Sequence, residues 1–184
     1  MKKRYYLAYG SNLHRQQMLW RCPDAELVGT ATIPDYRLMF KGSKTGAYLT
    51  IEPAKGHSVR VGVWAVSRQD EHCLDRYEGY PTFYYKKDMT VDVTEYATGE
   101  NHPAEAFVYI MHEERPLGMP SRAYTHTCCI GYAQFDFDIA VLNEAMNYTR
   151  MGERYERRTH SSTKKMPQLR TALRRGPCLE PKGQ

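Results

Sequence analysis

Short apolar runs separated by turn residues extend through most of this sequence, and they limit the fold more than any other feature. The runs are rich in valine, isoleucine, leucine and tyrosine, and glycine, proline, asparagine or aspartate bound most of them. Helical spacing of apolar residues occurs at only a few places between them. Strands with interspersed helices, rather than strict alternation of the two, predict an α+β domain. Its sheet is expected to curl into a small mixed β-barrel with surrounding helices.

The expected elements can be placed along the chain. Residues 52–56 are rich in turn formers and are predicted to join the two strands that flank them. The strands are predicted over residues 4–9, 26–40 with a break at Pro34-Asp35, 47–51, 59–66, 83–87, 90–96 and 104–111. The helices are predicted over 13–20 after a cap at Ser11 or Asn12, from Ser67 to Glu78, from Ser121 to about Gln134, and from Asp138 to Met146.

Length and hydropathy indicate one domain and no membrane span. A chain of 184 residues suits a single core with an extension. The uninterrupted apolar stretches are a few residues long, whereas a helix needs roughly 20 to cross a bilayer. The basic start, Met1 to Arg4, is followed by a segment too short and too polar for a secretory signal. A cytoplasmic location is therefore expected.

The net charge of +5 comes from one end of the chain. Residues 149–184 hold ten Lys or Arg and three Asp or Glu, which leaves 16 basic and 18 acidic residues in 1–148. We therefore divide the chain into a domain over 1–148 and a basic, partly flexible extension over 149–184, whose first part can continue a helix. A solvated basic tail explains this extension better than a nucleic-acid contact does, because such runs attract phosphate without specific contacts. A homodimer is left open.

Cysteines and histidines point to neither a disulfide framework nor a metal site. The five cysteines contain no C-x-x-C pair, and the seven histidines show no H-x-x-x-H or H-x-C spacing. A thiol nucleophile at Cys128 or Cys129 beside His126 is disfavoured, since unpaired cysteine is usually packing. We expect no metal and no cofactor.

The segment Tyr9-Gly10-Ser11-Asn12-Leu13 lies between the first predicted strand and the first predicted helix. Glycine lets the backbone turn tightly and approach a ligand, so that successive N–H groups can face an anion or a carbonyl oxygen. The segment lacks the further glycines of a dinucleotide fingerprint and the G-K-[ST] of a P-loop. An oxygen-binding loop and an ordinary structural turn explain it equally well.

Glu78 lies at the C-terminal end of a predicted helix, within a segment rich in tyrosine that runs from Leu74 to Lys86. The negative end of the helix dipole disfavours a carboxylate there, and nearby aromatic residues can remove water from it. Both effects would raise the pKa of the carboxyl toward the range useful for proton transfer at neutral pH. Taken alone, however, an exposed glutamate at a helix end is the simpler explanation.

Together these motifs resemble the gamma-glutamylcyclotransferase family, including its gamma-glutamylamine and AIG-type plant relatives. Y-G-S-N-L is similar to the family's N-terminal signature, and residues 74–86 are similar to its central signature, L-D-x-x-E-G-x-P-x-x-Y-x-[RK]. Pro120-Ser121-x-x-Tyr124 and the residues that follow, to Asp138, resemble a third. The likeness covers about residues 4–148. The family often has arginine in place of Lys86, which could alter how a substrate carboxylate is held, and glycine in place of Asp136.

The resemblance implies an enzyme for intramolecular acyl transfer on a small-molecule gamma-glutamyl substrate, of lyase or transferase class. The substrate's alpha-amine would attack its gamma-carbonyl, which gives 5-oxoproline and a free amine or amino acid. The family's catalytic glutamate falls on Glu78, as general base and then acid. The remaining implied site residues would hold the glutamyl portion or form the pocket wall, although a plain core role is open for the last two: Tyr9, Gly10, Ser11, Asn12, Leu13, Tyr84 and Tyr124.

Two alternatives stay open at this point. One is an enzyme that removes a gamma-glutamyl group from a biosynthetic intermediate by the same chemistry. The other is a binding module that keeps the cavity without catalysis. The presence of Glu78 favours an enzyme, because a binding module gains nothing from an acid buried at a helix end.

Overall fold

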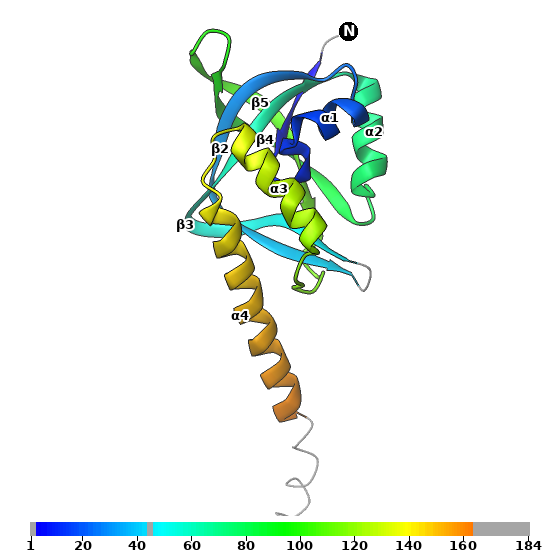
Figure 1. Ribbon diagram of the computed structural model, residues 1–184, viewed down its shortest axis with the longest axis vertical. Helices are drawn as coiled ribbons and strands as arrows, with labels where there is room; N and C mark the ends of the chain where they lie inside the picture. The colour runs from blue at the N-terminus through cyan, green and yellow to red at the C-terminus, as the bar shows by residue number, and fades with distance from the viewer. Residues whose placement is uncertain (1–2, 44–45, 164–184) are drawn as a thin grey trace, which may run out of the picture.

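Five strands close into a barrel in the computed structural model, which describes residues 3–43 and 46–163 (Figure 1). Around the barrel their order is β1-β3-β2-β4-β5. β1 pairs with β5 in parallel, and every other neighbouring pair is antiparallel. The expected α+β class and small mixed barrel are confirmed. The strands are β1 (Arg4–Ala8), β2 (Glu26–Ser43), β3 (Gly46–Val66), β4 (Tyr84–Glu95) and β5 (Asn101–Met111).

The helices lie outside the barrel. In Figure 1, α3 crosses in front of the strands, α1 and α2 lie to one side, and α4 projects away from the barrel. None of the helices in the described ranges is both long and apolar enough to cross a membrane. The helices are α1 (Arg15–Arg21), α2 (Arg68–Glu78), α3 (Arg122–Gln134) and α4 (Ala140–Thr163), and a 3-10 turn, η1 (Ser11–Leu13), follows β1.

Strand β3 shows that the predicted turn over residues 52–56 is wrong. β3 continues through that segment, and β2 pairs with it along nearly its whole length. The turn-forming residues are taken up by a register shift between Pro34 and Tyr36, where Asp35 and Gly56 both adopt left-handed conformations with φ of 58° and 80°. The Gly56 N–H donates to Asp35 Oδ1 at 2.8 Å. The same residues therefore form a bulge within a long hairpin.

Two other boundaries also differ from the prediction. The predicted strands 83–87 and 90–96 form one strand, β4, because Asp88 and Met89 stay paired with β5. The last helix does not stop at Met146 but continues to Thr163, so the predicted continuation of a helix into the extension is confirmed.

The barrel interior and the helix contacts form one apolar core. Leu7, Val63 and Phe107, from three adjacent strands, are fully buried inside it. Helix α3 approaches η1 so closely at Gly131 that a Cβ atom there would lie 2.7 Å from the Leu13 Cβ. The turn after β1 is thus pressed between the barrel and α3, which fixes the backbone of the glycine motif.

Candidate active site

Helix α2 supplies Glu78, its last residue. At its start Ser67 and Asp70 form a capping box: Ser67 Oγ accepts the Asp70 N–H at 3.1 Å, and Asp70 Oδ2 accepts the Ser67 N–H at 3.0 Å. At its end Gly79 adopts a left-handed conformation with φ of 65°. Both ends of α2 are therefore fixed, and with them the place of Glu78.

Asn12 joins Glu78 to the turn after β1. Its Nδ2 donates to Glu78 Oε1 at 2.9 Å and to Tyr6 Oη at 2.8 Å, while its Oδ1 accepts a hydrogen bond from Arg21 Nη1. The Arg21 guanidinium in turn lies 3.4 Å from the centroid of the Tyr77 ring. The predicted cap at Ser11 or Asn12 is wrong, because the His14 side chain caps α1. The Asn12 amide instead orients the carboxylate.

The environment of Glu78 changes its proton affinity. Burial raises the pKa of this carboxyl to about 7, while the positive charge of Arg21 and the Asn12 hydrogen bond act in the opposite direction. At neutral pH both the protonated and the ionised forms are therefore populated. A group in this state can accept a proton and return it, which is the requirement for a combined general base and acid.

The carboxyl faces a cavity of about 250 Å³. A narrow recess of about 20 Å³ extends from it and is lined by Tyr9, Gly10 and Asn12, among others. Of the predicted site residues, only Leu13 lines neither space, because it is fully buried beneath α3. The larger cavity is lined by Ser11, Tyr48, Tyr77, Glu78, Phe83, Tyr84 and Tyr124.

Tyr84 and Tyr124 form the wall opposite the glycine turn. Tyr84 Oη donates to the Leu49 carbonyl at 2.8 Å, and Tyr124 Oη accepts the Leu49 N–H at 3.1 Å. Burial raises the pKa of both hydroxyls well above the usual value, so both stay protonated. A Cβ atom on Gly10 would lie 3.2 Å from Tyr124 Oη, so glycine allows this close approach of turn and wall.

The sequence does not identify several residues of the site. They are Arg21 beside Asn12, Tyr48, Tyr77 and Phe83 in the cavity, and Tyr6, Leu49 and Tyr109 in the recess. Arg21 lies in the last turn of a helix, where a basic residue is ordinary, so nothing local distinguishes it. Tyr77 and Phe83 occupy unspecified positions of the central motif, directly beside the predicted residues. Tyr48 lies on β3, outside all the motifs, and only the fold brings it to the cavity.

Lys86 and Cys128, two further residues considered from the sequence, do not line the cavity or the recess. Lys86 Nζ contacts Glu71 at 2.6 Å and Asp75 at 2.7 Å, so the expected role of Lys86 in holding a substrate carboxylate is not supported. Cys128 is fully buried, and burial raises the pKa of its thiol to about 12, which opposes a thiolate nucleophile. Within the described ranges, no group of three or more His, Cys, Asp or Glu side chains is arranged to hold a metal ion.

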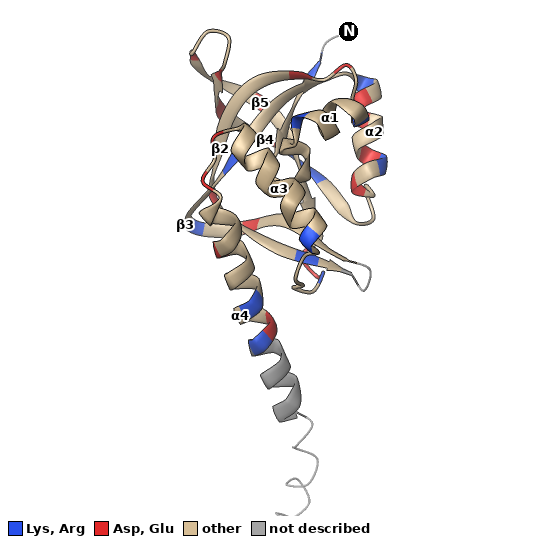
Figure 2. Cartoon of the chain, in the orientation of Figure 1, with Lys and Arg blue, Asp and Glu red and all other residues tan. Residues whose placement is uncertain are grey.

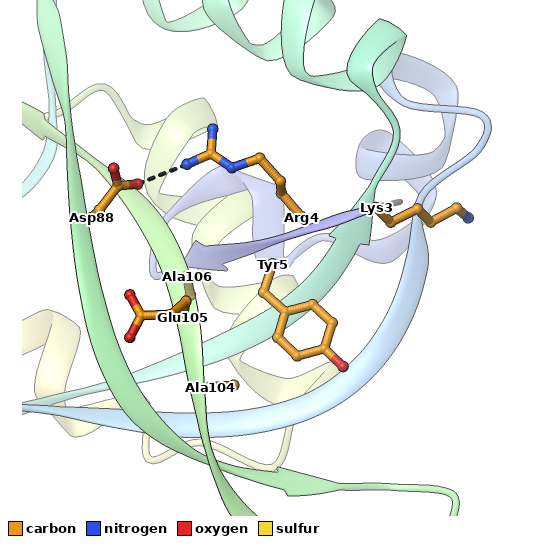
Figure 3. A pocket seen from close by; sticks show the side chains of 7 residues that line it. All are labelled: Lys3, Arg4, Tyr5, Asp88, Ala104, Glu105 and Ala106. Atoms are coloured by element: carbon orange, nitrogen blue, oxygen red, sulfur yellow. Dashed lines mark hydrogen bonds and ion pairs between the residues drawn. The ribbon is translucent and has the colours of Figure 1, made fainter. Parts of the chain in front are cut away.

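A larger hollow, of about 610 Å³, lies between the start of β1 and the strands β4 and β5 (Figure 3). Its charged groups are engaged with protein partners. Arg4 Nη2 donates to Asp88 Oδ1 at 2.7 Å, Lys3 contacts Glu26, and Glu105 accepts from Thr90 Oγ1. Unlike the cavity at Glu78, it contains no motif residue.

Comparison with known proteins decides the family. A profile of the family described as "Gamma-glutamyl cyclotransferase, AIG2-like" matches residues 6–126, about two thirds of the chain. The chain belongs to this family. All the predicted site residues lie within the matched range, and the family's enzymes are of cyclotransferase type.

Individual members of the gamma-glutamyl cyclotransferase family agree with this assignment. Gamma-glutamylcyclotransferases of Bos taurus and Homo sapiens are 30% and 31% identical over 134 and 135 residues, which is 68% of each chain compared. A gamma-glutamylaminecyclotransferase of Rattus norvegicus is 31% identical over 80 residues, or 42% of this chain and 54% of the relative. A solved structure named gamma-glutamyl cyclotransferase has a TM-score of 0.65 at 25% identity and covers 78% of this chain and 86% of its own.

Proposed function

We propose that this chain cyclises a gamma-glutamyl amine or peptide to 5-oxoproline and releases the free amine or amino acid. One observation carries the proposal: a carboxyl with a pKa of about 7, that of Glu78, accepts a hydrogen bond from Asn12 at the edge of the cavity beside the glycine turn. Membership of the gamma-glutamyl cyclotransferase family supports the choice of reaction.

Glu78 acts first as a base. The alpha-ammonium group of the substrate cannot attack while it carries its third proton, and the ionised Glu78 removes that proton. The free amine then attacks the gamma-carbonyl carbon of the same molecule, which forms the ring bond and places negative charge on the carbonyl oxygen. Holding amine and carbonyl within attack distance supplies about 7 to 11 kcal/mol of the barrier reduction in well-oriented intramolecular reactions.

The second half of the reaction returns the proton. Protonated Glu78 donates to the nitrogen of the leaving group as the bond from that nitrogen to the gamma-carbon breaks, and the oxygen charge collapses back to a carbonyl. The ring nitrogen still carries a second proton after the attack, and the ionised Glu78 removes it to leave the neutral lactam and passes it to the released amine, which departs as an ammonium ion. No water is consumed, and Glu78 ends ionised as it began. In this proposal the backbone N–H groups of the turn from Tyr9 to Asn12 stabilise the charged oxygen, since the packing of α3 against η1 fixes these donors in place, while the Leu13 N–H donates to the Gly10 carbonyl at 3.0 Å.

The proposal includes a small-molecule substrate and a cytoplasmic location. The four cysteines in the described part of the chain are all unpaired, including the adjacent Cys128 and Cys129. Unpaired thiols are typical of a reducing compartment.

The test is the variant Glu78→Gln, which keeps the size and the Asn12 contact but cannot exchange a proton. We expect 5-oxoproline release from gamma-glutamyl compounds to fall by about 10³-fold or more, since general acid and base catalysis is worth 10² to 10⁴ per group. Glu114→Gln, at an exposed carboxylate outside the cavity, is the matched control and should keep the parent rate. Parent-like turnover by Glu78→Gln would show that another group moves the proton.

A further inference from the structure

The cavity at Glu78 continues outward into a second space of about 420 Å³, which is widely open to solvent and is called the outer chamber below. The two spaces share Tyr48, Tyr77, Glu78 and Phe83 as lining residues. The outer chamber adds two arginines, Arg76 from α2 and Arg115 from the segment after β5. A molecule that reaches Glu78 through this chamber passes two guanidinium groups.

Neither guanidinium is neutralised by the protein. Among the side chains that the structure describes, in 3–42 and 46–154, no carboxylate forms an ion pair with Arg76 or Arg115, whereas Arg4 and Lys86 each contact two and Lys41 contacts one. Arg115 is held in place: its Nη2 donates to the Thr82 carbonyl at 3.1 Å, and its Cζ lies 4.9 Å from the centroid of the Phe83 ring.

Arg115 also has an unused donor. Its Nε is buried and has no hydrogen-bond partner. A buried donor without a partner costs stability, and a carboxylate offers the acceptor geometry that complements a planar guanidinium. The fixed guanidinium of Arg115 and the exposed one of Arg76 thus form a site for an anion at the outer end of the cavity.

We infer that Arg76 and Arg115 bind a carboxylate on the leaving group, so that the substrate class is a gamma-glutamyl amino acid or peptide rather than a gamma-glutamyl amine without an acid. This inference rests on the proposed function and deepens it.

The way the substrate must lie in the cavity assigns the carboxylate to the leaving group. The part of the substrate that becomes the ring must lie with its amine at Glu78 and its carbonyl at the glycine turn, which is the inner cavity. The leaving group is joined to the gamma-carbon on the side away from the new ring, so it extends toward the outer chamber. Its carboxylate, one carbon from the scissile nitrogen in an amino acid, then meets the two arginines.

The test compares gamma-glutamylalanine with gamma-glutamylalaninamide, which differ in charge at one position and little in size. We expect wild-type kcat/KM to favour the acid by about 10² and each of Arg76→Gln and Arg115→Gln to lower that preference about tenfold, as is usual for a hydrogen bond to a charged group. The loss should occur mainly in KM, because the carboxylate takes no part in bond making. Arg68→Gln, on the same helix but outside both chambers, is the control and should keep the preference.

Several outcomes would overturn the inference. Equal losses for the acid and the amide would show that the arginines hold the substrate's common glutamyl carboxylate or only support the fold. A wild-type enzyme without preference for the acid would contradict it directly. If neither compound yields 5-oxoproline, the proposed function fails, and calorimetric binding of the same two compounds to the wild type and the three variants decides the inference. Arg76 is exposed, so its variant gives a result even if Arg115→Gln fails to fold.

Discussion

Burial and two side chains control the proton on Glu78. The carboxyl loses water on burial, the positive charge of Arg21 favours its ionised form, and the Asn12 amide, to which Arg21 also donates, donates to it at 2.9 Å. Desolvation is the largest effect, so the pKa rises despite two stabilising partners. Arg21 and Asn12, which lower the pKa of Glu78, therefore set how close that pKa lies to 7.

Removing the charge of Arg21 should raise the pKa of Glu78 further. In Arg21→Met, the acid limb of the pH profile of kcat/KM, expected near pH 7 in the wild type, should move to higher pH because the free enzyme must ionise its base. Arg21→Lys keeps the charge and should leave the limb near its original place. An unchanged limb in Arg21→Met would show that Arg21 does not act on the carboxyl.

The raised pKa of Glu78 also predicts how stability depends on pH. Between the pKa of the unfolded chain, about 4.5, and the folded value of about 7, the folded state binds more protons, so stability falls as the pH rises through this window. The loss amounts to about 2 kcal/mol between pH 5 and pH 8. Urea unfolding of wild type and Glu78→Gln at both pH values measures it, since the variant lacks the titration. A wild-type advantage that grows with pH would contradict the burial of this carboxyl.

At the scale of elements, the close contact between α3 and η1 connects packing to the site. A Cβ atom at position 131 would lie 2.7 Å from the Leu13 Cβ and 2.8 Å from the His14 nitrogen, so the turn would have to move. This turn carries Ser11 and Asn12, and Asn12 holds Glu78. The glycine in α3 is therefore needed for the geometry of a site that it does not touch.

We predict that Gly131→Ala destabilises the protein by about 1 to 3 kcal/mol, as overpacking usually does, and also lowers kcat/KM. Thermal unfolding and 5-oxoproline release measure the two effects. Gly152→Ala is the control, because it also adds a methyl group to a helix but meets only the end of the flexible Leu117 side chain. Full activity in Gly131→Ala would show that the turn does not need its observed position.

The elements that are predicted from sequence are those with strong local signals. The capping box at Ser67, the left-handed Gly79 and the glycine turn each involve neighbours within a few residues, so helix α2 and the place of Glu78 follow from the sequence. The turn predicted over residues 52–56 is wrong because pairing with β2 over a long register outweighs local turn propensity. Arg21 and Tyr48 are missed because only the tertiary structure brings Arg21 to Asn12 and Tyr48 to the cavity.

At the scale of the molecule, the cavity and the end of α4 are separate. Every residue that lines the Glu78 cavity lies between Ser11 and Tyr124, whereas α4 packs on β2 and then projects away from the barrel (Figure 1). Thr149, the first residue of the predicted extension, is still buried and accepts the Phe40 N–H at 3.0 Å. The division of the chain after residue 148 remains a prediction. Figure 2 shows charges of both signs on the middle of α4.

Deleting residues 160–184 should therefore leave kcat/KM within about twofold of the full chain. The deleted residues follow Thr149, the last buried side chain among those of α4 described, up to residue 154, and surface changes away from a site have small effects. Steady-state assays of the shortened and the full chain, with circular dichroism to confirm folding, decide this. A large loss of turnover in a folded shortened chain would mean that the C-terminal segment closes over the site.

The hydrogen bonds that Asn12 makes with Glu78 and with Arg21 have a consequence for how such proteins diversify. The groups that tune the acid, Asn12 and Arg21, come from the first 21 residues, while the guanidinium groups of the outer chamber come from α2 and the segment after β5. Under the proposed function and the inferred carboxylate site, exchanging Arg76 and Arg115 would change the preferred leaving group while Asn12 and Arg21 still tune the pKa of Glu78. Related proteins with this fold could therefore differ in the leaving group that they accept and still share one reaction.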